Sequence, residues 1–144
     1  MSHKIVVGFD GSDASQRALD FSIARAQSQS DSILIAHVLE WSPYSFLTPS
    51  EVEERHRRRT EELERAETAI LTPVIRRIEQ EGIPVSTVLR YGHIADTLCR
   101  IAKDEGADMI VIGRMGHSGF ASRLFGSVAA TLAQVAPVPV VIVP

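Results

Sequence analysis

Apolar residues follow two different spacings along this 144-residue chain. Short runs rich in apolar, branched side chains recur five times, and such runs are typical of buried strands. They occupy residues 4–9, 33–38, 85–91, 108–112 and 140–143. Between the runs, apolar residues return every three or four positions, which indicates amphipathic helices. The pattern therefore predicts strands and helices in strict alternation.

Strands that alternate with helices form a parallel sheet with helices on both faces. We therefore expect one α/β domain over residues 1–144, a Rossmann-like sandwich around a five-stranded parallel sheet. The first helix should begin at Asp13, which with Gln16 resembles a capping box, and end near Ala26. Stripes at residues 94–102 and 128–135 predict two further helices.

The longest helix should start at Thr48-Pro49-Ser50-Glu51, a capping box with proline at the first helical position. It extends to about Gln80, and Pro73 should kink or split it. We expect its buried stripe to be Leu63, Ala66, Ile70, Val74 and Ile78.

Two segments near this helix allow more than one interpretation. Residues 55–59 are basic, but acidic residues follow one turn later, so we interpret them as a solvated face with mixed ion pairs. Binding of an acidic partner is the alternative. The loop at residues 40–49 holds several of the chain's few aromatic residues, and it either packs on itself or covers a ligand. These aromatic residues are Trp41, Tyr44 and Phe46.

Composition excludes several classes of protein. A net charge of −3 gives no basic field for nucleic acid. No apolar stretch approaches the roughly 20 residues of a membrane span, and no signal peptide is visible. Cys99 is the single cysteine, so an internal disulfide is impossible and a reducing compartment fits. We expect a cytoplasmic protein that binds no nucleic acid and does not insert into membranes.

In an open parallel sheet, ligands bind at the carboxyl ends of the strands. Four segments should meet there: Asp10-Gly11-Ser12, Val38, Gly92-His93 and the loop after residue 112. Together they can surround one nucleotide. Asp10 could accept a hydrogen bond from a ribose hydroxyl, bind a phosphate-bound Mg²⁺, or cap the next turn. The histidines show no zinc-type spacing, and we interpret His37 as a hydrogen-bonded core residue.

The loop after the fourth strand contains Gly113, Gly116, Gly119 and Gly126, and Ser127 then opens a helix. Glycines allow a close approach of the backbone, and free N–H groups at a helix start attract anions. Arg114, His117 and Arg123 could add positive charge. Two residues separate the first two glycines, and nine separate Gly116 from Gly126.

This G-x2-G-x9-G-S spacing resembles the motif of the ATP-binding universal stress proteins. The resemblance also includes the opening Lys-Ile-Val-Val-Gly-Phe-Asp-Gly-Ser, the turn at Gly92 and the closing Val-Pro-Val-Val-Ile-Val. It implies a ribose contact at Asp10 and an adenine contact at the backbone of Val38. It further implies a triphosphate cradle at Gly113, Gly116, Gly126, Ser127 and Val128, holding ATP with Mg²⁺.

The family resemblance also implies a homodimer through the last strand, with Val138, Val140, Val141 and Ile142, and a tetramer is conceivable. We expect a regulatory protein in which ATP occupancy modulates the dimer or an unidentified protein partner. A slow ATPase or nucleotidyl transferase is one alternative, and a nucleotide-free structural dimer is another. No nucleophile and base arrangement is evident, so no catalytic residue is assigned.

Overall fold

The computed structural model describes residues 3–40, 48–114 and 127–144. It contains a five-stranded parallel sheet in the order β3-β2-β1-β4-β5, which confirms the expected α/β architecture. The strands are β1 (Lys4–Gly8), β2 (Ser32–Glu40), β3 (Val85–Gly92), β4 (Met109–Gly113) and β5 (Val140–Val143). The central strand is β1, the first in the chain.

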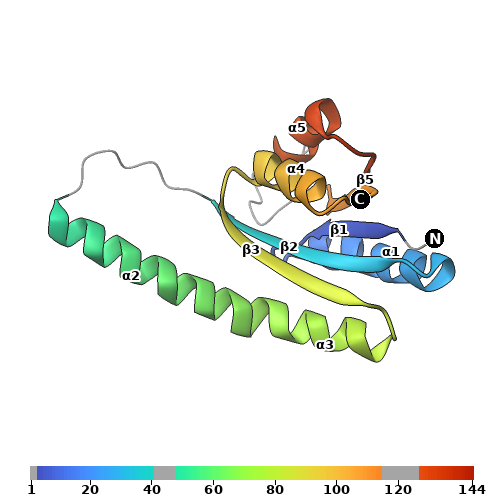
Figure 1. Ribbon diagram of the computed structural model, residues 1–144, viewed down its shortest axis with the longest axis horizontal. Helices are drawn as coiled ribbons and strands as arrows, with labels where there is room; N and C mark the ends of the chain where they lie inside the picture. Colours follow the sequence, from blue (N-terminus) through green and yellow to red (C-terminus); the bar gives the residue numbers. More distant parts are fainter. Residues whose placement is uncertain (1–2, 41–47, 115–126) are drawn as a thin grey trace.

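Helices cover both faces of this sheet (Figure 1). They are α1 (Asp13–Gln29), α2 (Pro49–Ala66), the π-helical turn η1 (Glu67–Leu71), α3 (Thr72–Gln80), α4 (Ile94–Asp104) and α5 (Ser127–Val135). Alternate residues of β1 belong to two different cores: Ile5 and Val7 pack with α1 and α3, while Val6 packs with α4 and α5. The central strand is therefore apolar at successive positions because both of its faces are buried.

Ser12, and not Asp13, caps α1. Its side chain accepts a hydrogen bond from the N–H of Ser15 at 3.2 Å, and its carbonyl accepts the hydroxyl of Ser15 at 2.9 Å. The expected capping box at Asp13 and Gln16 was therefore wrong by one residue. The helix also continues three residues beyond Ala26, to Gln29. By contrast, the capping box of Thr48 and Glu51 at the start of α2 is confirmed.

Pro73 lies in the first turn of α3, directly after η1. In η1 the N–H of Thr72 donates to the carbonyl of Glu67, five residues earlier. This wider turn adds one residue to the repeat, so Leu71 is buried where Ile70 was expected. The predicted interruption at Pro73 is thus confirmed, and its form is a π-turn that puts Leu71 in the buried stripe in place of Ile70, while Ala66, Val74 and Ile78 are buried as expected.

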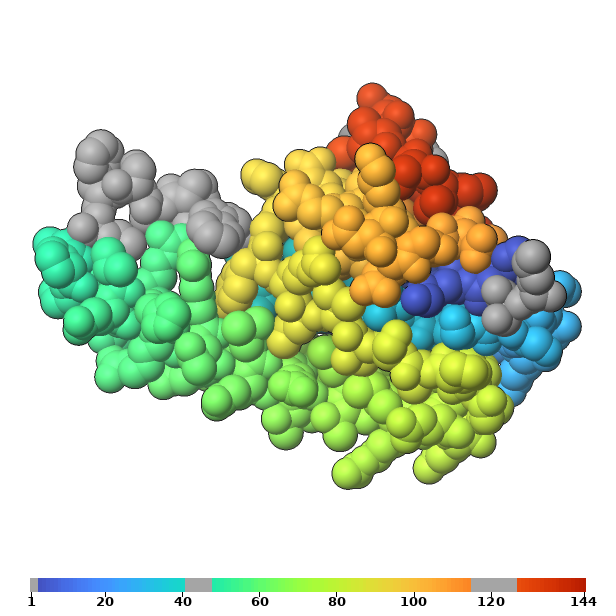
Figure 2. Space-filling model, in the orientation of Figure 1, coloured from blue at the N-terminus to red at the C-terminus, as the bar shows by residue number. Residues whose placement is uncertain are grey.

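Helix α2 extends beyond the ends of the strands in Figure 1, and its green residues extend beyond the residues of the strands in Figure 2. Ala66 is the buried residue of this helix. The basic segment forms mixed ion pairs as expected, because Arg57 and Arg58 both contact Glu54, although this acid precedes the basic run. None of the described helices is long and apolar enough to cross a membrane.

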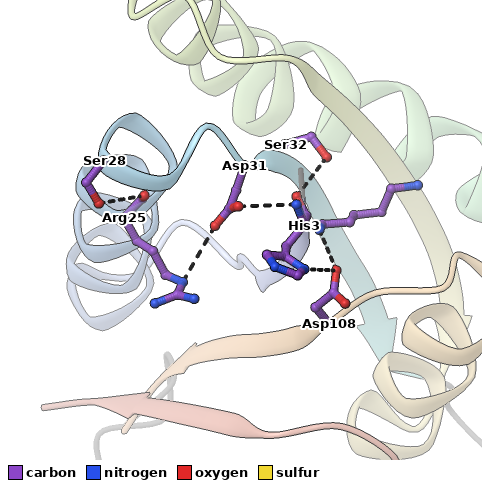
Figure 3. A network of polar contacts seen from close by, with 7 residues as sticks. His3, Arg25, Ser28, Asp31, Ser32 and Asp108 are labelled. Carbon is purple, nitrogen blue, oxygen red and sulfur yellow. Dashed lines mark hydrogen bonds and ion pairs between the residues drawn. The ribbon is translucent and has the colours of Figure 1, made fainter. Parts of the chain in front are cut away.

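Polar contacts join the amino ends of the central strands (Figure 3). The Lys4 N–H donates to Asp108 at 2.8 Å, and this bond lowers the pKa of the Asp108 carboxyl, with a further contribution from His3 at 3.3 Å. Asp31 is buried, accepts the His3 N–H at 3.2 Å and lies 3.6 Å from Arg25. These contacts hold β1 in register at the end of the sheet opposite the carboxyl ends of the strands.

Candidate functional site

A cavity of about 550 Å³ lies at the carboxyl ends of β1, β2 and β4. The chain passes from β1 to β2 on one side and returns on the other side as β4, so this is the topological switch point of the sheet. Helix starts and strand ends converge here because every strand points the same way. The described lining residues are Gly8, Phe9, Asp10, Ser12, Ser15, Ala36, His37, Val38, Leu39, Glu40, Ile70, Ile94, Leu98, Ile112, Gly113, Arg114, Ser127, Val128 and Ala129.

The cavity has both polar and apolar lining residues. Asp10, Arg114 and Ser127 are polar residues that lie where β1 and β4 end and where α5 begins. Leu39 of β2 and Ile70 of η1 contribute apolar side chains, and Glu40 of β2 contributes a carboxylate. A ligand with an anionic part and a flat apolar part would complement this arrangement.

Val38 presents its main chain beyond the end of β1. Even-numbered residues of β2 bond toward β1, as in Ser32 N–H to His3 and Phe9 N–H to the Ala36 carbonyl at 2.9 Å. Ile33 bonds toward β3 instead. The N–H and C=O of Val38 therefore face the β1 side, where β1 has already ended at Gly8. A donor and an acceptor are thus placed side by side at the cavity.

His37 closes the end of the β1–β2 ladder. In a continuing parallel ladder, the Phe9 carbonyl would accept the N–H of Val38. Instead it pairs with Nδ1 of His37 at 2.6 Å. His37 is 5% exposed, so the expected hydrogen-bonded core histidine is confirmed. It also lines the cavity, which the sequence analysis missed; a lone polar residue inside an apolar strand was the available signal.

Seven of the residues expected at the site line the cavity: Asp10, Ser12, Val38, Gly113, Arg114, Ser127 and Val128. The carboxylate of Asp10 accepts the Ser12 N–H at 2.9 Å, so it closes the turn before α1. The Arg114 N–H donates to the Val143 carbonyl at 2.8 Å and thereby continues the pairing of β4 with β5. Gly116, His117 and Gly126 lie outside the described residues, as do the aromatic residues Trp41, Tyr44 and Phe46.

Two expected residues, Gly11 and Gly92, do not line this cavity. Both have positive φ values, 84° and 153°, and both turn the chain from a strand into the following helix. A Cβ on Gly92 would lie 2.6 Å from Oγ1 of Thr97. Their glycine character therefore has a structural reason at these two turns.

Gly113 has a packing reason to be glycine. A Cβ added there would lie 2.6 Å from the Cβ of Ala14 and 2.7 Å from its backbone carbonyl atoms. The start of α1 therefore rests directly on the end of β4. This close approach exists whether or not a phosphate binds nearby.

A smaller cavity of about 300 Å³ adjoins the first and shares Glu40, Ile94, Ser127 and Val128 with it. It also includes His93 and Asp96. No group of three or more metal-ligating side chains occurs within the described ranges. Cys99 is half-buried beside the α4–α5 core, and burial raises the pKa of its thiol, with a smaller effect from Asp96.

Residues 1–144 match the universal stress protein family over their whole length. The chain belongs to this family. It is 30% identical to the universal stress protein YxiE of Bacillus subtilis, with 99% of each chain covered. The structure of UspA from Lactobacillus plantarum is similar with a TM-score of 0.78 and 26% identity, covering 99% of this chain and 97% of that one.

A universal stress protein whose crystal structure contains cAMP is also similar to this chain. The TM-score is 0.70 and the identity is 28%, and the match covers 99% of this chain and 96% of the other. A cyclic nucleotide therefore binds to a relative of this fold.

Proposed function

We propose that the cavity binds an adenine nucleotide, ATP with Mg²⁺, and that occupancy regulates the assembly or partner binding of the protein. The observation that carries this proposal is the main chain of Val38, whose N–H and C=O face the β1 side beyond the end of β1 and have no partner there among the described residues. An adenine edge carries a matching amino group and ring nitrogen. The cAMP complex of a family member supports a nucleotide as the class of ligand.

The polar side chains that lie where β1 and β4 end and where α5 begins fit the ribose and phosphates. Asp10 would accept hydrogen bonds from ribose hydroxyls or hold Mg²⁺ through its carboxylate. Ser127 and Val128, at the start of α5, would offer backbone N–H groups to phosphate oxygens, with Arg114 adding charge. The family resemblance adds Gly116 and Gly126 of the glycine motif to this phosphate cradle.

Regulation would act through β5. This strand pairs with β4 on one side only and therefore ends the sheet. Its apolar residues Val140, Val141 and Ile142, together with Val138, are half-buried in the single chain. An apolar edge strand is a template for pairing with a second copy. Strand β4 pairs with β5, and its last residues, Ile112 and Gly113, line the cavity. A bound nucleotide would therefore bias a homodimer.

The first experiment is to purify the protein without added nucleotide, denature it and identify the released molecule by mass spectrometry. We expect ATP. Released ADP would instead favour slow hydrolysis. An empty protein that also fails to bind ATP, AMP or cAMP in calorimetry would refute the proposal and leave a structural dimer. Sedimentation with and without ATP tests regulation, which requires a change in the assembly state or in capture of a partner.

A pair of variants tests the Val38 contact. Val38→Pro removes the N–H that lies outside the ladder, while Val38→Ala keeps it and serves as the control. One lost buried hydrogen bond corresponds to about 5-fold to 100-fold weaker ATP binding. We expect this loss in Val38→Pro alone. Equal affinity of both folded variants would contradict the assignment.

A further inference from the structure

His37 is a buried side chain that the family resemblance leaves without a role. Its Nδ1 atom lies 2.6 Å from the Phe9 carbonyl oxygen. A carbonyl oxygen only accepts, so Nδ1 must carry the hydrogen. In the neutral ring the lone pair then resides on Nε2, which becomes an acceptor of fixed position.

Nε2 is the ring nitrogen available to a ligand. Among the described residues, the hydrogen-bond partner of this ring is the Phe9 carbonyl, which pairs with Nδ1. His37 also lines the cavity. A group bound in the cavity beside this ring can therefore donate to Nε2.

The neighbours of His37 decide which part of a ligand it meets. Leu39 lies two positions further along β2 and so shares its face, and Ile70 lines the same cavity from η1. Ile70 is available there because the π-turn places Leu71 in the core instead. Asp10, Arg114 and Ser127 line the cavity where β1 and β4 end and where α5 begins, and Glu40 follows Leu39 on β2. Leu39 and Ile70 offer apolar surface to a planar base beside His37.

We propose that His37 is a specificity-determining residue whose Nε2 accepts a hydrogen bond from the exocyclic amine of the bound base. This inference rests on the proposed nucleotide function. An amine has two hydrogens, so it can satisfy the Val38 carbonyl and Nε2 together. A 6-oxo purine has no hydrogen on that group and would place an oxygen lone pair against Nε2. The ring proton cannot move from Nδ1 to Nε2 without loss of the hydrogen bond to the Phe9 carbonyl.

The test measures affinities for ATP and ITP by calorimetry in three proteins: wild type, His37→Asn and His56→Asn. Asparagine can keep the bond to Phe9 through its amide while it removes the group at Nε2. His56 is exposed on α2 and provides the matched control. We expect a preference for ATP of about tenfold or more in wild type and in His56→Asn, because a mismatched buried polar pair costs that much. The preference should fall by about tenfold in His37→Asn.

Two further measurements keep the inference testable if His37→Asn does not fold. His37→Gln offers an amide that can turn to donate or accept, so its ATP and ITP affinities should converge. In wild type with ¹⁵N-labelled histidine, the Nε2 resonance should shift on adding ATP and much less on adding ITP. A folded His37→Asn with an unchanged ratio would overturn the role of His37 while nucleotide binding stands. In folded His37→Asn, a lost preference for ATP over 2′-deoxy-ATP with an unchanged ratio of ATP to ITP affinity would place His37 at the ribose. That result would overturn its assignment to the base. Wild type that binds no nucleotide would overturn the proposed function itself.

Discussion

Gly113→Ala should destabilise the protein through a clash with backbone. The added Cβ would meet the C and O atoms of Ala14 at 2.7 Å and its Cβ at 2.6 Å. Gly113 has no positive φ, so the whole effect is steric. Overpacking of this kind costs about 1–3 kcal/mol. At about 4 °C per kcal/mol for a chain of this length, Tm should fall by roughly 4–12 °C.

Thermal and urea unfolding followed by circular dichroism would measure this loss. Gly8→Ala is a matched control, because its new Cβ would meet only side chains, Ile112 at 3.0 Å and Leu98 at 3.3 Å. Side chains can rotate away, so we expect a smaller loss there. Ala14→Gly in the Gly113→Ala background should rescue the stability only in part, since the backbone contacts persist.

A Gly113→Ala protein as stable as wild type would refute this account of the close approach. It would mean that the start of α1 can move away from β4 without loss of stability.

Two further predictions concern contacts away from the cavity. The hydroxyl of Tyr91 donates to Glu62 at 2.6 Å while Arg59 lies 5.3 Å from the ring centroid, and burial followed by the Glu62 bond raises the pKa of Tyr91 to about 12. Tyr91→Phe should therefore speed amide hydrogen exchange in α2 and leave exchange in β1 unchanged. Equal exchange of α2 in wild type and in Tyr91→Phe would show that other contacts hold α2 in place. The lowered pKa of Asp108 lies below the unfolded value of about 3.9, so its ionised form stabilises the fold above that pH and this contribution is lost as the pH falls below it. The stability difference between wild type and Asp108→Asn in urea titrations should be greatest near neutral pH and should decline as the pH falls below the unfolded value and through the lowered folded-state pKa; a difference that grows toward low pH would contradict the sign.

Features that depend on neighbours along the chain could be predicted from the sequence alone. Branched apolar runs located the five strands, and the capping box at Thr48 located the start of α2. Pro73 indicated an interruption of the long helix because a proline ring does not fit inside a regular helix. The spacing of the glycines indicated the family, because this spacing can be read directly from the sequence.

Features that depend on residues far apart in sequence became visible only in the folded protein. The strand order places Phe9 beside His37, and only this pairing fixes which ring nitrogen faces the cavity. The contact of α1 with β4 gives Gly113 a steric role that its motif does not reveal. The π-turn replaced Ile70 with Leu71 in the core, because a regular repeat could not anticipate one extra residue. Periodicity records which face of an element is buried, whereas the contacts that shape the cavity arise only when separate elements meet.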